Sequence, residues 1–281
     1  MLAKSMAALT LVASASAMAQ SPWQFNLYGV LGSEGDLQRG GTLSEQQVGA
    51  KIAYTQPMAQ GRLMGVSLSM DVADYNVKNA TITGLDDLDQ RQQYQLSGFM
   101  MQPLSREWSL VVSPSLNWSY ADGASFSDGF GWGLLGMANY RASNTLRWGF
   151  ALSYTNDVYD NQFAPFITVD WQINDQWRLS NPFEAGFNGR AGLELSYKAN
   201  TNLEFGLGGG YRQEEFAFKD GAVKQELPMG FVRMTYKIRP GLNWNFIAGY
   251  RTEGELKWRE NGRTNKTDVD GRGLLAVLVN F

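Results

Sequence analysis

Two side chains that carry much of protein chemistry are missing from this sequence. Its 281 residues include no histidine and no cysteine. Histidine is the commonest general base and metal ligand, and cysteine supplies thiolate nucleophiles, thiolate ligands and disulfides. We therefore expect no cofactor and no metal site, so charged side chains and glycine-rich segments are the groups left to examine.

Residues 131–136 read GWGLLG and have the spacing of the glycine motif that binds dinucleotides. That motif works only where it follows a strand and opens a helix, whose N-terminus then binds the pyrophosphate. Here it lies inside a run of alternating apolar and small or polar residues, which is typical of a strand. We interpret Gly131 and Gly133 as positions that leave space or let a sheet bend.

Three carboxylates, Asp86, Asp87 and Asp89, stand close together in the polar stretch 76–89. We interpret this cluster as part of a solvated loop. Contact with a divalent cation or with lipopolysaccharide is the alternative for these side chains. A catalytic site made of carboxylates alone is also left open by the sequence.

A larger set of charged residues recurs at every second position of alternating segments. In 242–251, for example, Leu242, Trp244, Phe246, Ala248 and Tyr250 alternate with mostly polar or small residues. This period of two is the signature of a strand with one apolar face. We predict that eleven charged residues on the polar faces line the interior of a barrel: Asp71, Arg147, Asp170, Arg178, Glu194, Lys198, Glu204, Arg212, Arg233, Lys237 and Arg251. They either line a hydrated pore and set its selectivity, or pair with one another and fill a closed lumen.

The strands that must position these charges are unusually long. They run for about nine to thirteen residues, which is the length a tilted strand needs to cross a bilayer. Tryptophan and tyrosine stand near both ends of the apolar faces, as Trp108 and Trp118 do, and such aromatic girdles mark membrane interfaces. The sequence therefore predicts an all-β fold, a closed antiparallel up-and-down transmembrane β-barrel.

Turn signals set the expected number of strands. Short turns are predicted at 57–60, 103–106, 142–144, 174–176, 199–201 and 239–241, and longer loops at 33–44, 76–89, 121–128, 157–161, 182–185, 217–224 and 255–270. They separate fourteen strands, and twelve is the alternative because the segment Trp177–Ser180 is short. The four three-residue turns predict that Tyr197 lies beside Leu203, Tyr236 beside Trp244, Arg141 beside Thr145 and Ile173 beside Trp177.

The N-terminus has the layout of a secretory signal peptide, with Lys4, a short apolar stretch and small residues before Ala19. We expect cleavage between Ala19 and Gln20 and a single barrel domain over 20–281. The net charge of −3 offers no basic stripe for nucleic acid. No run of eighteen apolar residues follows, which excludes a helical membrane protein.

The last strand resembles those of bacterial outer-membrane proteins. It ends the chain on Phe281, with Leu275, Val277 and Val279 in phase with it. The resemblance implies that the barrel-assembly machinery reads this strand as its assembly signal. It also implies a place in the outer membrane of a Gram-negative bacterium, in contact with outer-membrane lipid and lipopolysaccharide.

A second resemblance covers roughly 163–281 and is carried by the segments 165–171 (PFITVDW), 177–179 (WRL), 192–197 (GLELSY), 208–211 (GGGY) and 254–256 (GEL). They are similar to an outer-membrane barrel family of unknown function. This resemblance implies the fold and supplies no activity.

Two functions follow from these features. The first is a porin-like channel for small solutes, and the second is a non-conducting barrel with a structural, adhesive or envelope-interaction role. The familiar outer-membrane barrel enzymes resemble one another in using a histidine, which this chain lacks. We therefore predict that the protein is not an enzyme.

Overall fold

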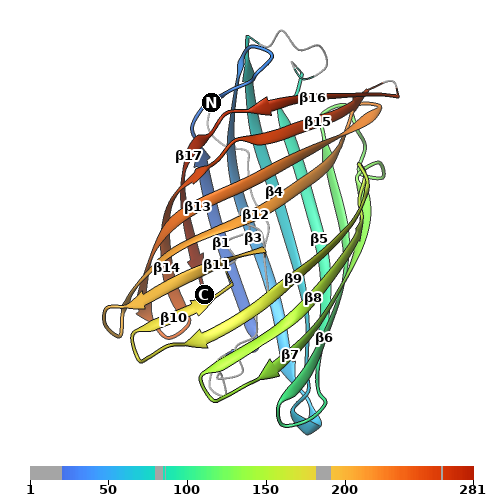
Figure 1. Cartoon of the computed structure of the whole chain (residues 1–281). Helices are drawn as coiled ribbons and strands as arrows, with labels where there is room; N and C mark the ends of the chain where they lie inside the picture. Colours follow the sequence, from blue (N-terminus) through green and yellow to red (C-terminus); the bar gives the residue numbers. More distant parts are fainter. Residues whose placement is uncertain (1–20, 80–84, 86, 182–190, 261) are drawn as a thin grey trace.

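The computed structural model describes residues 21–79, 85, 87–181, 191–260 and 262–281. These residues form one closed sheet wrapped into a barrel (Figure 1). Three of the sequence predictions lie outside the described residues: the signal peptide with its cleavage site between Ala19 and Gln20, the acidic residue Asp86, and the loop 182–185.

Fourteen strands make the wall, each antiparallel to the next. They are β1 (Trp23–Gly32), β3 (Thr42–Pro57), β4 (Leu63–Lys78), β5 (Gln90–Pro103), β6 (Trp108–Ala121), β7 (Phe130–Arg141), β8 (Leu146–Asn156), β9 (Asn161–Gln172), β10 (Trp177–Ser180), β11 (Ala191–Lys198), β12 (Leu203–Phe218), β13 (Gly221–Arg239), β14 (Leu242–Arg251) and β17 (Arg272–Asn280). The last strand pairs with the first, Leu278 opposite Tyr28, and so closes the ring. The fourteen-strand prediction is confirmed and the alternative of twelve is wrong, because the short β10 is a wall strand.

Three further strands lie at the ends of the wall strands: β2 (Gly35–Asp36), β15 (Gly254–Glu260) and β16 (Arg263–Val269). The helical content of the described residues is one turn, η1 (Ala59–Gly61). None of the helices in the described ranges is long and apolar enough to cross a membrane.

The apolar face of the wall points outward. Phe150, Phe163 and Leu207 each expose more than 60% of their surface, whereas Ser69 and Asp71 on the inward face of β4 are buried. Soluble β-sandwiches hide the apolar faces of their strands between two sheets. This barrel does the reverse, so its outer surface needs an apolar surrounding.

Outward aromatic side chains gather near both ends of the strands. At one end Trp108 packs on Tyr140 and Trp177 on Tyr197, with ring centroids 5.0 and 4.8 Å apart. Towards the other end Trp118 stacks on Phe126 at 5.3 Å. The two groups leave an aliphatic belt between them, as the girdle pattern of the sequence predicts.

Four tight connections share one five-residue turn: 104–108, 142–146, 173–177 and 199–203. In each, the first residue donates its backbone N–H to the carbonyl of the fifth, at 2.9 to 3.0 Å. The second residue is Ser105, Ser143, Asn174 or Asn200, and its side-chain oxygen accepts the N–H groups of the fourth and fifth residues. Serine and asparagine favour this local bond, so the turn is encoded within its own five residues.

This turn corrects two of the four predicted pairings. Tyr236 lies opposite Trp244, and Ile173 bonds to Trp177, as predicted. The predicted pair of Arg141 with Thr145 is wrong, since Arg141 lies opposite Arg147. Tyr197 likewise lies opposite Phe205 and not Leu203. The capping side chains of Ser143 and Asn200 shift each of these two loops one residue toward the C-terminus. The partner of Arg141 and of Tyr197 therefore moves by two residues, so the inward and outward faces of the paired strands still match.

Two predicted loops are wrong because they are hairpins. β12 and β13 continue to Phe218 and from Gly221, so only two residues join them, and β15 pairs with β16 over most of 255–270. The alternation of apolar residues persists there, as in Leu256 and Trp258. Figure 1 shows both hairpins extending across one end of the barrel, with β15 also paired to β13.

Candidate functional site: a charged interior closed at one end

The two ends of the barrel differ. One carries the five-residue turns and the described chain ends, where Phe25 and Phe281 exchange backbone hydrogen bonds, and is called here the terminal end. The other carries the β12–β13 and β15–β16 hairpins and is called the loop end. The charged residues of the interior change character from the first to the second.

All eleven charged residues predicted for the lumen lie on the inward face of their strands, by register with buried residues of neighbouring strands. Six more inward charges were not predicted: Glu45, Lys51, Arg91, Arg141, Glu214 and Arg272. The described wall strands therefore present eleven basic and six acidic side chains to the interior, although the whole chain has a net charge of −3. The interior is strongly cationic relative to the rest of the protein.

Several of the inward charges that were not predicted stand beside predicted loops. Glu45 follows 33–44, Arg91 follows 76–89 and Arg272 follows 255–270. β3, which carries Glu45, begins at Thr42, inside the predicted loop, whereas Arg91 and Arg272 lie at the starts of β5 and β17, next to the predicted loops. The phase of the alternation identifies Glu45 and Arg91. Every second residue of β3 and β5, counted from the partners of Asp71 in the register, faces inward, and this count includes Glu45 on β3 and Arg91 on β5.

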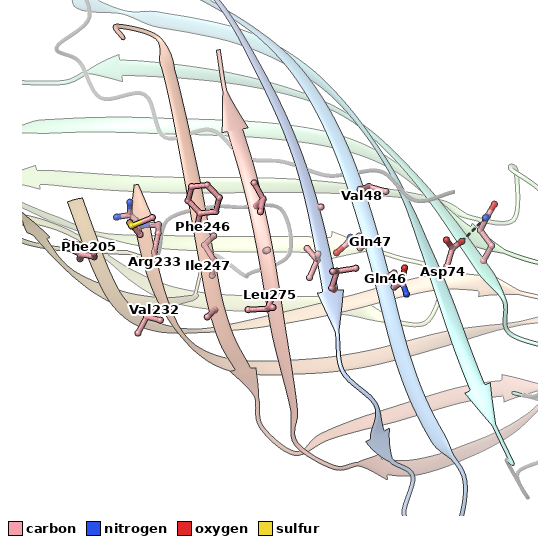
Figure 2. Close-up of a pocket in the computed structure, with 18 of the residues that line it drawn as sticks. Gln46, Gln47, Val48, Asp74, Phe205, Val232, Arg233, Phe246, Ile247 and Leu275 are labelled. Carbon is pink, nitrogen blue, oxygen red and sulfur yellow. Dashed lines mark hydrogen bonds between the residues drawn. The ribbon is translucent and has the colours of Figure 1, made fainter. Parts of the chain in front are cut away.

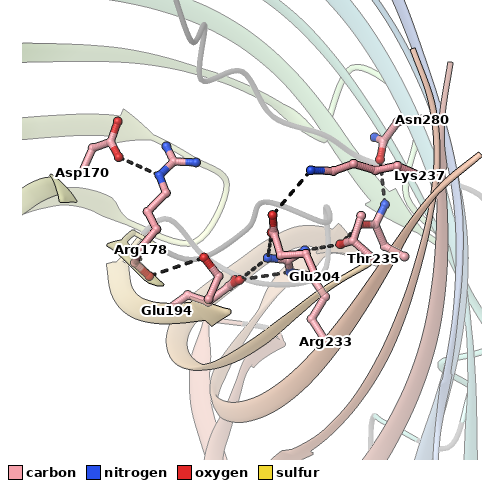
Figure 3. Close-up of polar contacts among 10 residues, drawn as sticks. Asp170, Arg178, Glu194, Glu204, Arg233, Thr235, Lys237 and Asn280 are labelled. Carbon is pink, nitrogen blue, oxygen red and sulfur yellow. Dashed lines mark hydrogen bonds and ion pairs between the residues drawn. The ribbon is translucent and has the colours of Figure 1, made fainter. Parts of the chain in front are cut away.

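At the terminal end the inward charges form a partly exposed network, called here the open cluster (Figure 3). Arg233 donates to Glu194 through Nε at 3.0 Å and to Glu204 through Nη2 at 2.8 Å. Lys237 Nζ lies 3.6 Å from Glu204, and Arg178 donates to Asp170 at 2.7 Å. The side chains of Arg178, Asp170 and Lys237 are 40 to 43% exposed, so solvent reaches this part of the interior.

Glycine makes room for this network. Gly206 of β12 lies between Glu194 on β11 and Arg233 on β13, and their ion pair passes over it. A Cβ at this position would stand 2.9 Å from Glu194 Cδ and 3.3 Å from Arg233 Nε. Any larger residue would therefore displace the pair.

Deeper toward the loop end the charges are fully buried. Arg91 contacts Asp71 at 2.8 Å, and Arg212 contacts Glu214 at 2.7 Å. Arg91 also reaches Glu214, with Nη2 and Oε2 3.7 Å apart. The side chains of Arg91 and Asp71 expose none of their surface, so they fill this level of the interior.

A second buried group centres on Glu45. Its Oε2 accepts a bond from Arg251 at 2.5 Å and lies 3.4 Å from Arg272 Nη2. Nε and Nη2 of Arg251, and Nε and Nη1 of Arg272, have no hydrogen-bond partner among the described residues. One carboxylate thus neutralises two guanidinium groups, which leaves basic hydrogen-bond donors inside the barrel. The buried charged residues of this level are called here the buried cluster: Glu45, Asp71, Arg91, Arg212, Glu214, Arg251 and Arg272.

Above the buried cluster, apolar side chains from opposite walls touch. Tyr75 of β4 stacks on Phe216 of β12, with ring centroids 5.9 Å apart, and Ala217 pairs with Tyr120 of β6. In the ring of fourteen strands, β12 lies across the barrel from β5, with β4 and β6 beside it. The β12–β13 hairpin therefore folds over the mouth, and Val223 and Trp258 complete the apolar layer.

Polar contacts fix this cover to the connection between β8 and β9. Arg259 of β15 lies over the ring of Tyr159 at 4.3 Å and donates to its carbonyl at 2.7 Å. Lys224 pairs with Asp160 at 2.9 Å, and Glu215 accepts the backbone N–H groups of Tyr159 and Asp160. We call this set the latch.

The latch has an acidic neighbour with a shifted pKa. Burial, followed by the nearby carboxylates of Glu215 and Asp160, raises the pKa of Asp157 to about 7. The carboxyl group therefore changes charge within the range in which bacteria live.

A hollow of about 1410 Å³ borders the wall where the first and last strands meet (Figure 2). Most of its lining residues face outward, as do Phe205, Val232, Phe246 and Leu275, which expose 38 to 61% of their surface. Gln47 and Arg233 of the inward face also border it. The hollow thus belongs mainly to the apolar outer wall, and the charged interior is the candidate site.

The other chemical candidates take ordinary structural places. Residues 131–136 lie within β7, so no helix follows them. Asp87 pairs with Lys219 at 2.8 Å, and its side chain is 70% exposed. Among the described residues, no three acidic side chains are grouped so that they could hold a metal ion. The residues predicted to form an assembly signal, Leu275, Val277, Val279 and Phe281, face outward along β17 and its end.

Comparison with known proteins agrees with this architecture. The family described as a domain of unknown function (DUF6268) matches residues 41–266. No curated protein matches the sequence. An outer membrane channel from Pseudomonas putida F1 has a TM-score of 0.54 at 8% identity, covering 96% of this chain and 100% of that one.

Two other solved barrels are similar at lower scores. A FadL homologue from Pseudomonas aeruginosa has a TM-score of 0.49 at 10% identity, covering 92% of this chain and 89% of its own. The NanC porin has 0.43 at 12% identity, covering 92% and 98%. At these identities the likeness concerns the barrel fold alone.

Proposed function

The chain belongs to the DUF6268 family, whose function is unknown, and we propose a function for it from the barrel itself. We propose that it is a gated, porin-like channel for small solutes in the bacterial outer membrane. In this conformation the channel is closed at its loop end. We expect the loop end to face the outside of the cell and the terminal end to face the periplasm.

One observation carries this proposal: the same interior is solvated and charged at the terminal end and sealed by a folded-over hairpin at the loop end. Arg178 and Lys237 are 40% exposed or more, while Arg91 exposes nothing. The seal consists of hairpin extensions, so it can be removed without breaking any pairing of the wall between the girdles. Charge lining a hydrated passage is what ion and solute selectivity require.

The membrane setting is part of the proposal. Outer-membrane lipid and lipopolysaccharide would contact the outward face, where Leu68, Phe163 and Ile167 are 51 to 65% exposed. The barrel-assembly machinery would read Leu275, Val277, Val279 and Phe281. Residues 1–19 would direct export and be removed before Gln20.

A reversible cross-link tests the gate. Because the chain has no cysteine, the double variant Tyr120→Cys/Ala217→Cys introduces a single possible disulfide, which ties β12 to β6 across the mouth. In planar bilayers, the reduced protein should show stepwise conductance that disappears on oxidation. The matched control, Leu68→Cys/Leu96→Cys, links neighbouring wall strands β4 and β5 and should conduct equally in both states.

Shortening the hairpin provides the decisive second variant. Residues 215–224 are replaced by Asn-Gly between the paired residues Glu214 and Gln225, which suits a two-residue turn and keeps Glu214 of the buried cluster. This variant should conduct continuously. A folded barrel that stays silent with the hairpin shortened would overturn the channel proposal.

The second candidate is a non-conducting barrel with a structural, adhesive or envelope-interaction role. The apolar contact of Tyr75 with Phe216 favours it, because a permanently filled mouth needs no polar lining. Its test is the reverse result: silence in every variant, together with loss of an envelope or binding phenotype when the β15–β16 hairpin is deleted.

A further inference from the structure

The interior carries an excess of positive charge that is not explained by pairing. Eleven basic and six acidic side chains face inward on the described wall strands, whereas the net charge of the whole chain is −3. Random placement of charge in a slightly acidic protein would give the opposite sign. The excess is therefore a property of the inward face.

The excess persists where solvent enters. Around the open cluster, the acids Asp170, Glu194 and Glu204 each already contact a basic partner. Three further inward cations of this region, Arg141 on β7, Arg147 on β8 and Lys198 on β11, have no ion-pair partner among the described residues. Arg147 and Lys198 are both exposed. In the strand register Arg147 lies opposite Asp170 and Lys198 opposite Glu204, but these two acids accept bonds from Arg178 and Arg233, so the charges of Arg147 and Lys198 are available to a solute.

The strands β4, β5 and β6, across the barrel from this cluster, carry neutral hydroxylated residues at this level. Ser67 of β4, Ser97 of β5 and Ser115 of β6 lie on its inward face, level with one another through the ladder. A solute at the terminal end would thus meet guanidinium and ammonium groups on one side and hydroxyl donors on the other. Both sides favour a species that accepts hydrogen bonds and carries negative charge.

We infer that the terminal half of the lumen binds small anions and that the channel, when open, selects anions over cations. This inference rests on the proposed channel function. Arg147 and Lys198 are the residues expected to capture an oxyanion, because Arg233 and Arg178 are already engaged by carboxylates of the protein. A carboxylate or a phosphate group would meet the same chemistry here.

The reversal potential measures this selectivity directly. Using the reduced Tyr120→Cys/Ala217→Cys protein in a KCl gradient, the ratio of chloride to potassium permeability should exceed one. The double variant Arg147→Gln/Lys198→Gln should move the ratio toward one or below it. The control Arg62→Gln/Arg106→Gln removes two exposed charges from turns at the same end and should leave the ratio unchanged.

Acetate and phosphate then show whether the site binds carboxylates, phosphates or both. Each is added to the chamber at the terminal end, and a concentration-dependent block of chloride current is the expected sign of binding, weaker in Arg147→Gln/Lys198→Gln. Block by one anion and not the other identifies the class. A channel that conducts but prefers potassium would overturn the inference and leave the channel function standing, whereas a silent protein would count against the channel itself.

Discussion

Arg91 and Glu214 lie on opposite walls of the barrel, with Nη2 and Oε2 3.7 Å apart and neither side chain appreciably exposed. Arg91 belongs to β5 and Glu214 to β12, which are diametrically placed in the ring of strands. Their contact means that charge, as well as apolar packing, spans the closed level of the lumen.

Loss of Glu214 should therefore destabilise the barrel strongly. Glu214→Ala leaves Arg91 and Arg212 buried with one acidic partner fewer, a situation that costs about 3 to 5 kcal/mol. The temperature of unfolding in detergent measures the loss. Glu34→Ala, which breaks a half-exposed ion pair with Lys78, serves as the control and should change little. Equal effects of the two substitutions would contradict the buried-cluster assignment.

Substitution of Gly206 should disrupt the open cluster. In Gly206→Ala the new methyl group meets Glu194 and Arg233, so we expect a loss of about 1 to 3 kcal/mol in unfolding free energy. Gly136→Ala is the matched control, since a Cβ there has nothing within 4 Å. Denaturant unfolding of both variants checks the difference, and a neutral Gly206→Ala would refute the steric argument.

The latch should tighten in acid. Because burial raises the folded pKa of Asp157 from 3.8 to about 7, protonation favours the docked connection. The stabilisation is complete below the ordinary pKa and declines as the pH rises toward about 7, above which it levels off. Hydrogen exchange of residues 157–162 should slow between pH 8 and pH 5, after correction for intrinsic rates.

Two variants isolate the group responsible. Asp157→Asn should abolish this pH dependence between about pH 5 and pH 8. Asp128→Asn should keep it, because hydrogen bonds from Ser125 lower the pKa of Asp128, so it does not titrate in that range. A pH dependence that survives in Asp157→Asn would assign it to another group.

Arg259 should hold the cover closed. Arg259→Ala removes both the contact with the Tyr159 ring and the bond to its carbonyl, together worth about 1 to 3 kcal/mol. The open fraction of the channel should rise, measured as the open probability in planar bilayers. Lys266→Ala on the adjacent strand gives the comparison, because its side chain is 67% exposed and lies outside the latch. No rise in Arg259→Ala would place the gate elsewhere.

The barrel itself follows from local patterning, as the alternation in 242–251 illustrates: period two, long strands and paired aromatics together define a wall with an apolar exterior. The inward phase of residues such as Arg233 and Glu194 follows from the same pattern. The closure at the loop end could not be read in this way. It depends on contacts such as Tyr75 with Phe216, between residues far apart in sequence, and alternation says nothing about which strands meet across a lumen.

Turn chemistry explains the smaller errors. Ser143 and Asn200 are the second residues of their five-residue turns and each accept two backbone N–H groups, which shifts the loop by one residue from a count based on polarity. Glycine and acidic residues in 217–224 and 255–270 indicate loops, yet the strand period runs from Phe216 to Phe218 on β12, resumes at Val223 on β13 and includes Trp258 on β15. Periodicity was the better guide at both places.

The five-residue turn also bears on how the polypeptide reaches its final state. Each copy, such as 173–177, fixes the alignment of its two flanking strands through atoms that are never more than four residues apart. The two strands that flank a turn can consequently pair from the turn outward while distant segments are still unfolded, and such short-range pairing is fast. Among the pairings of the barrel wall, that of β1 with β17 joins the most distant segments of the chain. We therefore expect closure of the barrel at this pair to be the slowest step of folding.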